Sequence, residues 1–225
     1  MKKKNTKTIL AALGALAAFV LWTFLVRCVD VQPIGPDGSC VGFAAINGAF
    51  HALTGVHWAL YTLTDWLGLV PIGIALGFAV LGLVQLIRRK SLLKVDRDIL
   101  ILGGFYIVVL AVYLLFETVV INFRPVLIDG KLEASYPSST TMLALCILPT
   151  AMMQLKTRIR SDAVRRAILG ILAAFTVFMV VGRLISGVHW LTDIIGGVLL
   201  SGELVMLYAF AVKRQGKSRD NSLGT

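Results

Sequence analysis

The sequence has 225 residues, of which 57% are hydrophobic and only 15% are charged. A soluble domain is usually about 45–50% apolar and about 25% charged, so this composition excludes an ordinary soluble enzyme and a disordered chain. Three cysteines are also too few for a disulfide-rich secreted scaffold. We therefore expect an all-α polytopic membrane protein, with residues 1–225 forming a single membrane domain.

Six apolar stretches are long enough to cross a membrane as helices, for which about 20 residues are needed. The alternating pattern of a membrane β-barrel is absent, and helices satisfy their own backbone hydrogen bonds in lipid. The first stretch follows four lysines, as in a signal peptide, but it is longer than the ~7–15 residues of a cleaved signal core, so we interpret it as a retained helix. The predicted spans are Thr8–Val26, Leu67–Ile87, Ile99–Ile121, Ser138–Leu155, Ala167–Ile185 and Trp190–Val212.

The net charge of +10 indicates the orientation of these helices rather than a nucleic-acid partner. Eighteen of the 22 lysines and arginines fall in residues 1–7, 88–98, 156–166 and 213–225. Because basic residues mark the cytoplasmic side, the two terminal segments and the two loops are predicted to be cytoplasmic tails and cytoplasmic loops. The basic loops serve either as this orientation signal, which we favour, or as contacts for anionic membrane lipids.

Residues 27–66 are predicted to form a long external connection between the first two spans. The later part, 41–66, is amphipathic and aromatic, as expected of a helix that lies in the membrane interface. Cys28 and Cys40 both fall in this connection and could pair in an oxidising compartment, although spacing alone does not give their geometry. His51, His57 and Asp65 of this connection lack the spacing of metal ligands, so we expect no metal.

Three external helix ends carry the residues that indicate chemistry. His189 and Asp193 are four residues apart at the start of the last span, so they share a helix face. The carboxylate can accept a hydrogen bond from one imidazole nitrogen and leave the other as a nucleophilic lone pair. Arg183 lies six residues before His189, across a turn, and its guanidinium suits a phosphate oxyanion.

The other two helix ends predict an anion site. Pro137 restricts the chain just before the fourth span, and Ser138 is a good helix N-cap. The free backbone N–H groups of the first helical turn favour phosphate. Arg124, followed by Pro125, would bring a second guanidinium to this site.

Two arginines, a helix N-terminus with hydroxyls and an oriented histidine together predict phosphoryl transfer through a phosphohistidine intermediate, without a metal or other cofactor. Each residue alone also has an ordinary interpretation, as a polar histidine in a turn or an arginine that reaches lipid headgroups. Their convergence at three helix ends on one side of the membrane favours the catalytic interpretation.

This constellation resembles the type-2 phosphatidic acid phosphatase superfamily of membrane lipid phosphatases, whose motifs are Lys-x6-Arg-Pro, Pro-Ser-Gly-His and Ser-Arg-x5-His-x3-Asp. Arg124-Pro125 matches the end of the first motif, and Pro137-Ser138 matches the start of the second. The third motif is matched at the family's spacing by Arg183, His189 and Asp193. The resemblance covers residues 117–197 and agrees with a plan of six helices.

The resemblance implies a role for each matched residue. His189 would be the nucleophile, with Asp193 as its orienting partner. The groups that would bind the phosphoryl oxygens are those of Arg124, Arg183, Ser138 and the Ser139 amide.

The sequence departs from the family at four positions. Glu117 replaces the lysine of the first motif, Ser139 the glycine of the second and Gly182 the serine of the third. Thr140 replaces the second-motif histidine that protonates the leaving group in the family, and loss of a general acid typically costs about 10²–10⁴-fold in rate. Three explanations remain open: a disabled variant, a diphosphate substrate whose leaving group needs less protonation, or headgroup binding without turnover.

We therefore expect a hydrolase of the membrane lipid phosphatase type, impaired or specialised at Thr140. Its substrate would be a phosphomonoester or diphosphate of a long-chain lipid, such as a polyprenyl diphosphate or a phosphatidate-like lipid. The expected location is the bacterial plasma membrane, among membrane lipids, with the active site on the extracytoplasmic side. The alternative is a catalytically inactive protein of the same fold that binds phospholipid headgroups.

Overall fold

The computed structural model describes the backbone of residues 2–223 and the side chains of residues 13–214. Over this range the chain forms eight α-helices and two 3-10 helices, with isolated β-bridges but no strand. The predicted all-α class is therefore confirmed for the described residues. The helices are α1 (Lys2–Cys28), η1 (Pro36–Gly38), α2 (Ala44–Thr54), α3 (Trp58–Leu67), α4 (Leu69–Arg89), η2 (Leu92–Lys94), α5 (Arg97–Thr118), α6 (Ser139–Arg158), α7 (Asp162–Ile185) and α8 (Leu191–Leu223).

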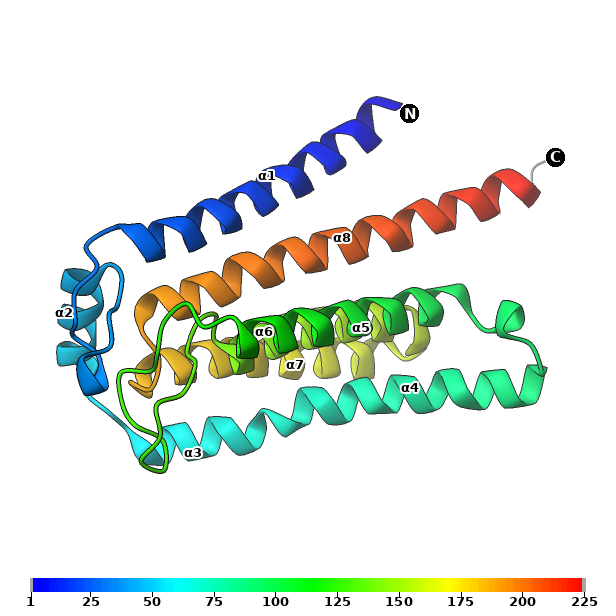
Figure 1. The fold of residues 1–225 in the computed structure, drawn as a ribbon. Coiled ribbons are helices and arrows are strands. Elements are labelled where there is room, and N and C mark those ends of the chain that lie inside the picture. Colours follow the sequence, from blue (N-terminus) through cyan, green and yellow to red (C-terminus); the bar gives the residue numbers. More distant parts are fainter. Residues whose placement is uncertain (1, 224–225) are drawn as a thin grey trace.

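The long helices run side by side in one bundle, and the short helix α2 lies across one end of it (Figure 1). Helix α6 is the centre of the bundle, because it contacts α4, α5, α7 and α8, while α1 packs along α8. The loop between α5 and α6 folds back over the end that carries α2 and α3 (Figure 1). This end of the bundle therefore collects the loops that follow α1, α5 and α7.

Four stretches are long and apolar enough to cross a membrane: Trp58–Arg89, Arg97–Thr118, Asp162–Ile185 and Leu191–Arg214. The apolar part of α1 with described side chains is shorter, at Leu13–Cys28. Helix α6 is more polar, since it buries hydroxyl and amide side chains such as Thr150 and Gln154 inside the bundle. The prediction of six spans thus stays a prediction, although each predicted segment lies mainly within helices; the third extends three residues beyond the end of α5 at Thr118.

An aromatic cluster fastens the loop before α6 to the bundle. Tyr136 is 1% exposed, stacks on Phe19 of α1 and meets Phe116 of α5 edge-on. Its hydroxyl lies 2.7 Å from the Thr23 hydroxyl. A Cβ at Gly196 of α8 would fall 2.5 Å from the Tyr136 ring, so glycine is needed where this ring packs on α8. The start of α6 is thereby held against α1, α5 and α8.

The later part of the predicted connection, residues 41–66, differs from the single interfacial helix expected there. The structure divides it at Gly55, which has a φ of +66°, into α2 and a helix α3 that continues towards α4. Cys28 and Cys40 are free in the structure.

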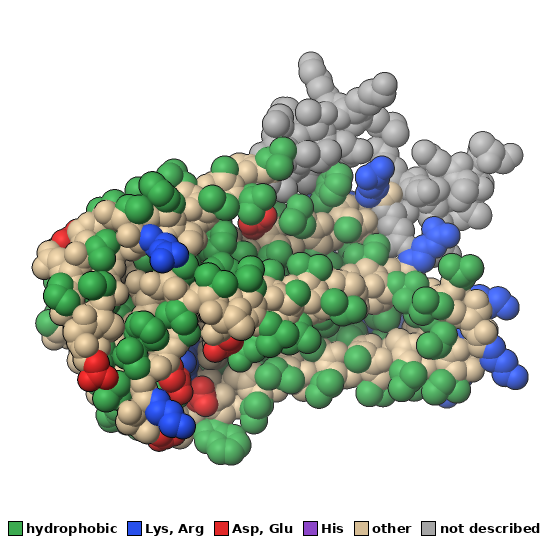
Figure 2. Space-filling view, viewed as in Figure 1, with side chains coloured by type: hydrophobic (Ala, Val, Ile, Leu, Met, Phe, Trp, Pro, Cys, Tyr) green, Lys and Arg blue, Asp and Glu red, His purple; other side chains and the backbone are tan. Residues whose placement is uncertain are grey.

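The two ends of the bundle differ in charge. Lysines and arginines gather at the end where α4 and α5 are joined, and acidic residues gather at the opposite end (Figure 2). Hydrophobic side chains cover much of the surface between them (Figure 2). The predicted cytoplasmic tails contribute basic residues whose side chains lie outside the described range: Lys2, Lys3, Lys4, Lys7, Lys217 and Arg219.

Candidate functional site

The turn between α7 and α8 presents His189 at the acidic end of the bundle. Gly187 in this turn has a φ of +72°, and a Cβ there would fall 1.9 Å from the carbonyl oxygen of Gly55. Only glycine fits both the left-handed backbone and this close approach. The His57 backbone N–H also donates to the carbonyl of Ser186, at 3.0 Å. The α2–α3 turn therefore supports the turn that carries the histidine.

His189 and Asp193 come together as predicted from their spacing, but not through a direct hydrogen bond. The imidazole Nδ1 and the carboxylate Oδ2 are 4.0 Å apart. Between them lies the hydroxyl of Ser135, 3.0 Å from Nδ1 and 2.5 Å from Oδ2. Because this hydroxyl donates to the carboxylate, it accepts the proton of Nδ1–H.

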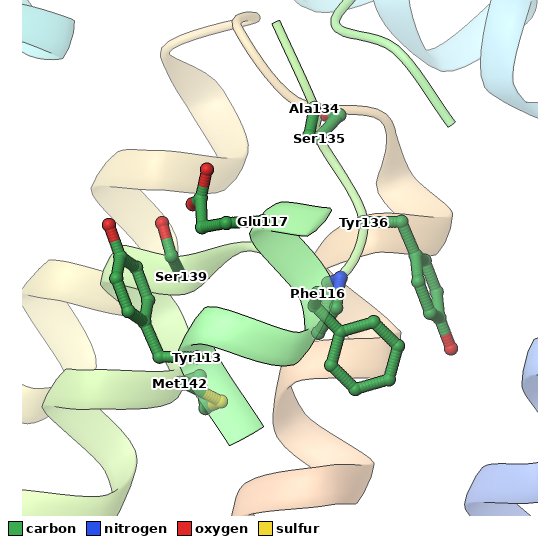
Figure 3. A pocket seen from close by; sticks show the side chains of 9 residues that line it. Tyr113, Phe116, Glu117, Ala134, Ser135, Tyr136, Ser139 and Met142 are labelled. Carbon is green, nitrogen blue, oxygen red and sulfur yellow. The ribbon is translucent and has the colours of Figure 1, made fainter. Parts of the chain in front are cut away.

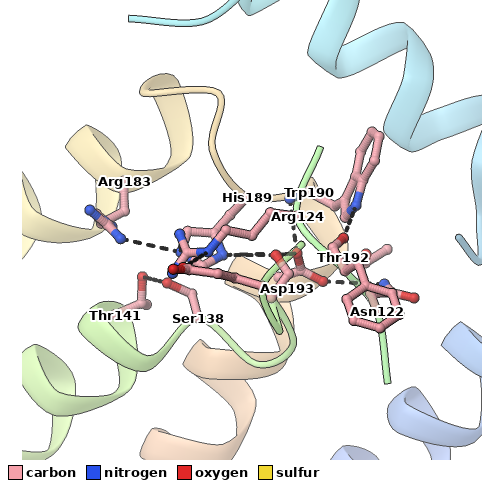
Figure 4. A network of polar contacts seen from close by, with 12 residues as sticks. Asn122, Arg124, Ser138, Thr141, Arg183, His189, Trp190, Thr192 and Asp193 are labelled. Carbon is pink, nitrogen blue, oxygen red and sulfur yellow. Dashed lines mark hydrogen bonds and ion pairs between the residues drawn. The ribbon is translucent and has the colours of Figure 1, made fainter. Parts of the chain in front are cut away.

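The other imidazole nitrogen faces the two predicted arginines. A guanidinium nitrogen of Arg124 lies 3.2 Å from Nε2 of His189, and one of Arg183 lies 3.4 Å from it (Figure 4). Guanidinium groups only donate hydrogen bonds, so Nε2 must carry the lone pair. This contact and the Ser135 contact select the same tautomer, in which Nδ1 carries the proton and Nε2 the lone pair.

The environment of His189 keeps its imidazole neutral. The side chain is 2% exposed, and burial lowers the pKa of His189 well below its usual value. The positive charges of Arg124 and Arg183 lower this pKa further, while a hydrogen bond of the ring with the Ser135 backbone raises it. A neutral imidazole with a free lone pair is the form required of a nucleophile.

Each arginine of the site already pairs with a carboxylate. Arg183 is 1% exposed, lies 3.5 Å from Asp65 Oδ1 and has its guanidinium over the Tyr61 ring. Arg124 is 9% exposed, and its Nε lies 3.1 Å from Glu133. The Nε atoms of both arginines are buried without a well-aligned hydrogen-bond partner among the described residues. Each guanidinium thus has one nitrogen near a carboxylate and another near Nε2 of His189.

The loop between α5 and α6 brings several of these side chains to the histidine. Its two arms pair as a hairpin, with a β-bridge between Phe123 and Ala134, and the Arg124 N–H donates to the carbonyl of Glu133. The Ser135 N–H likewise donates to Asn122. One arm therefore carries Arg124 and the other carries Ser135 and Glu133.

At the start of α6, one residue joins the buried hydrogen-bond network and the next two line an open cavity. Ser138 is the N-cap residue, but its hydroxyl donates to Thr141 at 3.0 Å rather than to the helix backbone. Its backbone N–H donates to the carbonyl of Asp193. Ser139 and Thr140, in contrast, line the cavity together with both arginines. The hydroxyl of Ser138 is thus the one predicted phosphate ligand that is turned away from the cavity.

The cavity has a volume of about 690 Å³ and opens beside the guanidinium groups of Arg124 and Arg183. Its walls also include three carboxylates, Asp65, Glu117 and Glu133. A smaller recess next to it is lined by Glu117, Ser135 and Ser139 among others (Figure 3). The replaced positions Glu117 and Thr140 therefore both face the space where a substrate would bind.

An apolar groove of about 870 Å³ continues from this cavity between α4 and α5. The two spaces share three lining residues: Ile72, Tyr113 and Leu143. The groove is lined from there towards the basic end by aliphatic and aromatic side chains and glycines, with no charged residue. A ligand with a polar head and a long apolar chain matches this pair of spaces.

Sequence reasoning missed three residues that hold the reacting groups in place. Ser135 bridges His189 and Asp193, and Asn122 donates to the second oxygen of Asp193 at 3.3 Å. Asn47 of α2 bonds to Thr192 at the start of α8. None of them has a spacing to His189 that would single it out, because each joins the network from another element. Among the described residues, no group of three or more His, Cys, Asp or Glu is placed to hold a metal.

Comparison with known proteins assigns the chain to a family. The model of the PAP2 superfamily matches residues 100–217, more than half of the sequence. The chain therefore belongs to the PAP2 superfamily, as the resemblance of its motifs predicted. The comparison with curated proteins found no match.

One solved structure has a similar fold. It is the crystal structure of a transmembrane PAP2-type phosphatidylglycerolphosphate phosphatase from Bacillus subtilis. The match has a TM-score of 0.52 and 20% sequence identity, and it covers 90% of this chain and 96% of the other. Together with the four apolar helices, this fold makes the chain an integral membrane protein.

Proposed function

We propose that this protein is a membrane lipid phosphatase that removes phosphate from a long-chain lipid through a phosphohistidine on His189. The observation that carries the proposal is the position of Nε2, which has its lone pair directed at two buried guanidinium groups beside an open cavity. A phosphoryl group bound by these arginines would lie next to the nucleophile.

The reaction would proceed in two displacements at phosphorus. The Nε2 lone pair forms the N–P bond while the bond from phosphorus to the leaving oxygen breaks. Water then attacks the phosphohistidine, which releases inorganic phosphate and restores the imidazole. Arg124 and Arg183 stabilise the charge on the equatorial oxygens in both steps, since fixed positive groups at a developing charge lower the barrier most.

A lipid substrate is supported by the apolar groove between α4 and α5. The groove joins the cavity at Ile72, Tyr113 and Leu143, so a chain attached to the phosphate can lie along the two helices. The two helices also belong to stretches apolar enough to cross a membrane, which would place the groove within the hydrocarbon layer.

Thr140 favours a diphosphate over a phosphomonoester. Thr140 lines the cavity, but a threonine hydroxyl is far too weak an acid to protonate an alkoxide leaving group at neutral pH. A phosphate leaving group needs much less protonation than an alkoxide. We therefore propose a polyprenyl diphosphate-like lipid as the better substrate, and a phosphatidate-like lipid as a poor one.

The experiment compares phosphate release from a polyprenyl diphosphate and from phosphatidate in detergent micelles. The wild-type protein should favour the diphosphate. The variant Thr140→His should raise the rate on phosphatidate by about 10²–10⁴-fold and change the rate on the diphosphate much less. Release of phosphate from neither substrate by either protein would reject the enzyme function for these lipids.

His189→Ala tests the nucleophile in the same assay. It should abolish turnover of both substrates, because no other group in the site can form the N–P bond. His57→Ala is the matched control, since among the described residues its ring bonds only to the Thr54 carbonyl at the end of α2. Full activity of His189→Ala would contradict the assigned role.

A second function, headgroup binding without turnover, is favoured by Glu117 and Thr140. These residues replace a cation and an acid of the family motifs and both face the cavity. Saturable binding of lipid phosphate that persists without phosphate release, even in Thr140→His, would support this alternative.

The active site is proposed to lie on the extracytoplasmic side of a bacterial plasma membrane. Residues 88–98 and 156–166, which comprise the α4–α5 and α6–α7 loops and the adjoining helix ends, carry ten lysines and arginines at the end of the bundle remote from His189. Such loops are typically retained in the cytoplasm.

A further inference from the structure

We infer that Ser135 is a positioning residue that transmits the charge of Asp193 to His189 through its hydroxyl. The inference rests on the proposed function of His189 as a phosphoryl acceptor. The spacing of the third motif predicts that Asp193 itself accepts the hydrogen bond from His189. We assign this contact to Ser135, which is not one of the matched motif residues.

The interatomic distances distinguish a direct hydrogen bond between His189 and Asp193 from a link through Ser135. At 4.0 Å, Nδ1 of His189 and Oδ2 of Asp193 are too far apart for a hydrogen bond. The Ser135 hydroxyl is within hydrogen-bond distance of both atoms, at 3.0 Å and 2.5 Å. A hydroxyl has a single proton, which it gives to the carboxylate, so the imidazole proton must be directed at the hydroxyl oxygen.

The surroundings keep Asp193 from moving closer to the ring. Its Oδ2 also accepts the Trp190 backbone N–H at 2.9 Å, and its Oδ1 accepts from Asn122 at 3.3 Å. The carboxylate is 0% exposed. Ser135 is itself buried, and its backbone N–H is held by the carbonyl of Asn122. The bridge is therefore built into the hairpin and the start of α8.

The bridge matters when the N–P bond forms. At that moment the imidazole becomes cationic while it lies between two arginines, which is unfavourable unless a negative charge is coupled to the ring. The Nδ1–H···Oγ–H···Oδ2 chain provides this coupling without any proton transfer. Hydrogen bonds in such a chain polarise one another, so the middle hydroxyl strengthens the effect of the carboxylate.

The test is a double-mutant cycle with Ser135→Ala and Asp193→Asn, measured as kcat and KM for phosphate release. Ser135→Ala should lower kcat by about 10²-fold or more and leave KM within a few-fold, because the arginines that bind the phosphate are retained. If Ser135 carries the link, Asp193→Asn should cost much less in the Ser135→Ala background than in the wild type. An equal cost in both backgrounds would overturn the inference.

Two further variants separate this role from a structural one. Ser135→Thr keeps a hydroxyl at the same position and should restore much of kcat. Ser201 lies in α8 about two helical turns beyond Asp193, and its buried hydroxyl bonds to the Met142 carbonyl of α6. Ser201→Ala removes this hydroxyl and should leave kcat unchanged. A Ser135→Ala protein with wild-type kcat would show that Asp193 reaches the ring unaided.

A measurement on the resting protein keeps the inference testable if no substrate is turned over. The Nδ1–H proton of His189 should give a downfield NMR signal that exchanges slowly, and Ser135→Ala should shift it upfield or remove it. An unchanged signal would reject the bridge. Absence of turnover in the wild type with this signal intact would reject the proposed function alone.

Discussion

At the residue scale, the site is a neutral histidine held between two arginines and a serine-linked carboxylate. This arrangement makes the protonation state of His189 the quantity most open to measurement. Burial is the main reason that its pKa lies well below the usual value, and the charges of Arg124 and Arg183 add to the effect. The imidazole of His189 should therefore remain unprotonated in conditions where an exposed histidine is cationic.

We predict that His189 does not titrate near pH 6.5, the usual value for histidine. In Arg124→Gln one positive charge is lost, so the pKa of His189 should rise towards that value. The unfolded chain takes up this proton below about pH 6.5 and the folded chain does not, so the contribution of His189 should make folding less favourable as the pH falls below that point. NMR titration of the imidazole in both proteins measures the shift. A wild-type pKa at or above 6.5 would contradict the buried, neutral histidine.

We also predict that Gly187→Ala abolishes activity and lowers thermal stability. The left-handed backbone costs about 1–2 kcal/mol for a residue with a Cβ, and the added carbon would clash with the Gly55 carbonyl. Gly170→Ala is the control, since a Cβ there meets no atom within 4 Å. Activity assays and thermal unfolding in detergent compare the two, and equal behaviour would mean that the turn adapts.

The sequence predicted the residues of the third motif better than the contacts between them. The spacing of Arg183, His189 and Asp193 along one turn and one helix start was enough to predict that they meet. The partner that completes this network could not be chosen among the hydroxyls of residues 135–140, because only the hairpin pairing decides which one faces the imidazole. Ser138, the best N-cap by sequence, turned out to bond with Thr141 instead.

At the element scale, α2 acts as a brace across the end of the bundle. The Asn47 amide donates to the Gly42 carbonyl and to the Thr192 hydroxyl, and its oxygen accepts the Thr192 N–H. The ring of His51 lies 3.1 Å from the Gly187 carbonyl. The existence of an amphipathic segment here was predictable from its pattern. Its fastening to α8 was not, since no periodicity reports a bond between residues 145 positions apart.

We predict that Asn47→Ala lowers kcat and destabilises the protein by about 1–3 kcal/mol, because it leaves buried polar groups of α8 without partners. Thr54→Ala in the same helix is the matched control, since its hydroxyl bonds only within α2. Phosphate release and thermal unfolding report the two effects. If both variants behave alike, α2 does not hold the start of α8.

At the scale of the whole molecule, the two ends of the bundle have opposite character, with the site at the acidic end and the basic loops at the other. The apolar lengths of the helices were predictable because the membrane imposes them. The central position of α6 could not be predicted in this way. Its polar residues Thr150 and Gln154 make it a weaker candidate for a membrane span by sequence, and their partners are known only from the structure.

Thiol labelling in intact cells tests the orientation. Cys28 and Cys40 are exposed at the site end, and both should react with a membrane-impermeant maleimide. A cysteine at Ser91, in the basic loop between α4 and α5, should react only after the membrane is permeabilised; it is introduced with both exposed cysteines replaced by alanine. Cys146 is buried and should stay silent in both cases. Labelling of Ser91→Cys in intact cells would reverse the proposed topology.

The carboxylates beside the two arginines have a consequence for product release. Free phosphate left in the site would have to compete with Glu133 and Asp65, which already lie within 3.1 Å and 3.5 Å of the same guanidinium groups. Once the lipid chain no longer holds the phosphate in the site, these two carboxylates can pair with the arginines again. Inhibition by inorganic phosphate should therefore be weaker than it would be if the two arginines had no carboxylate partners.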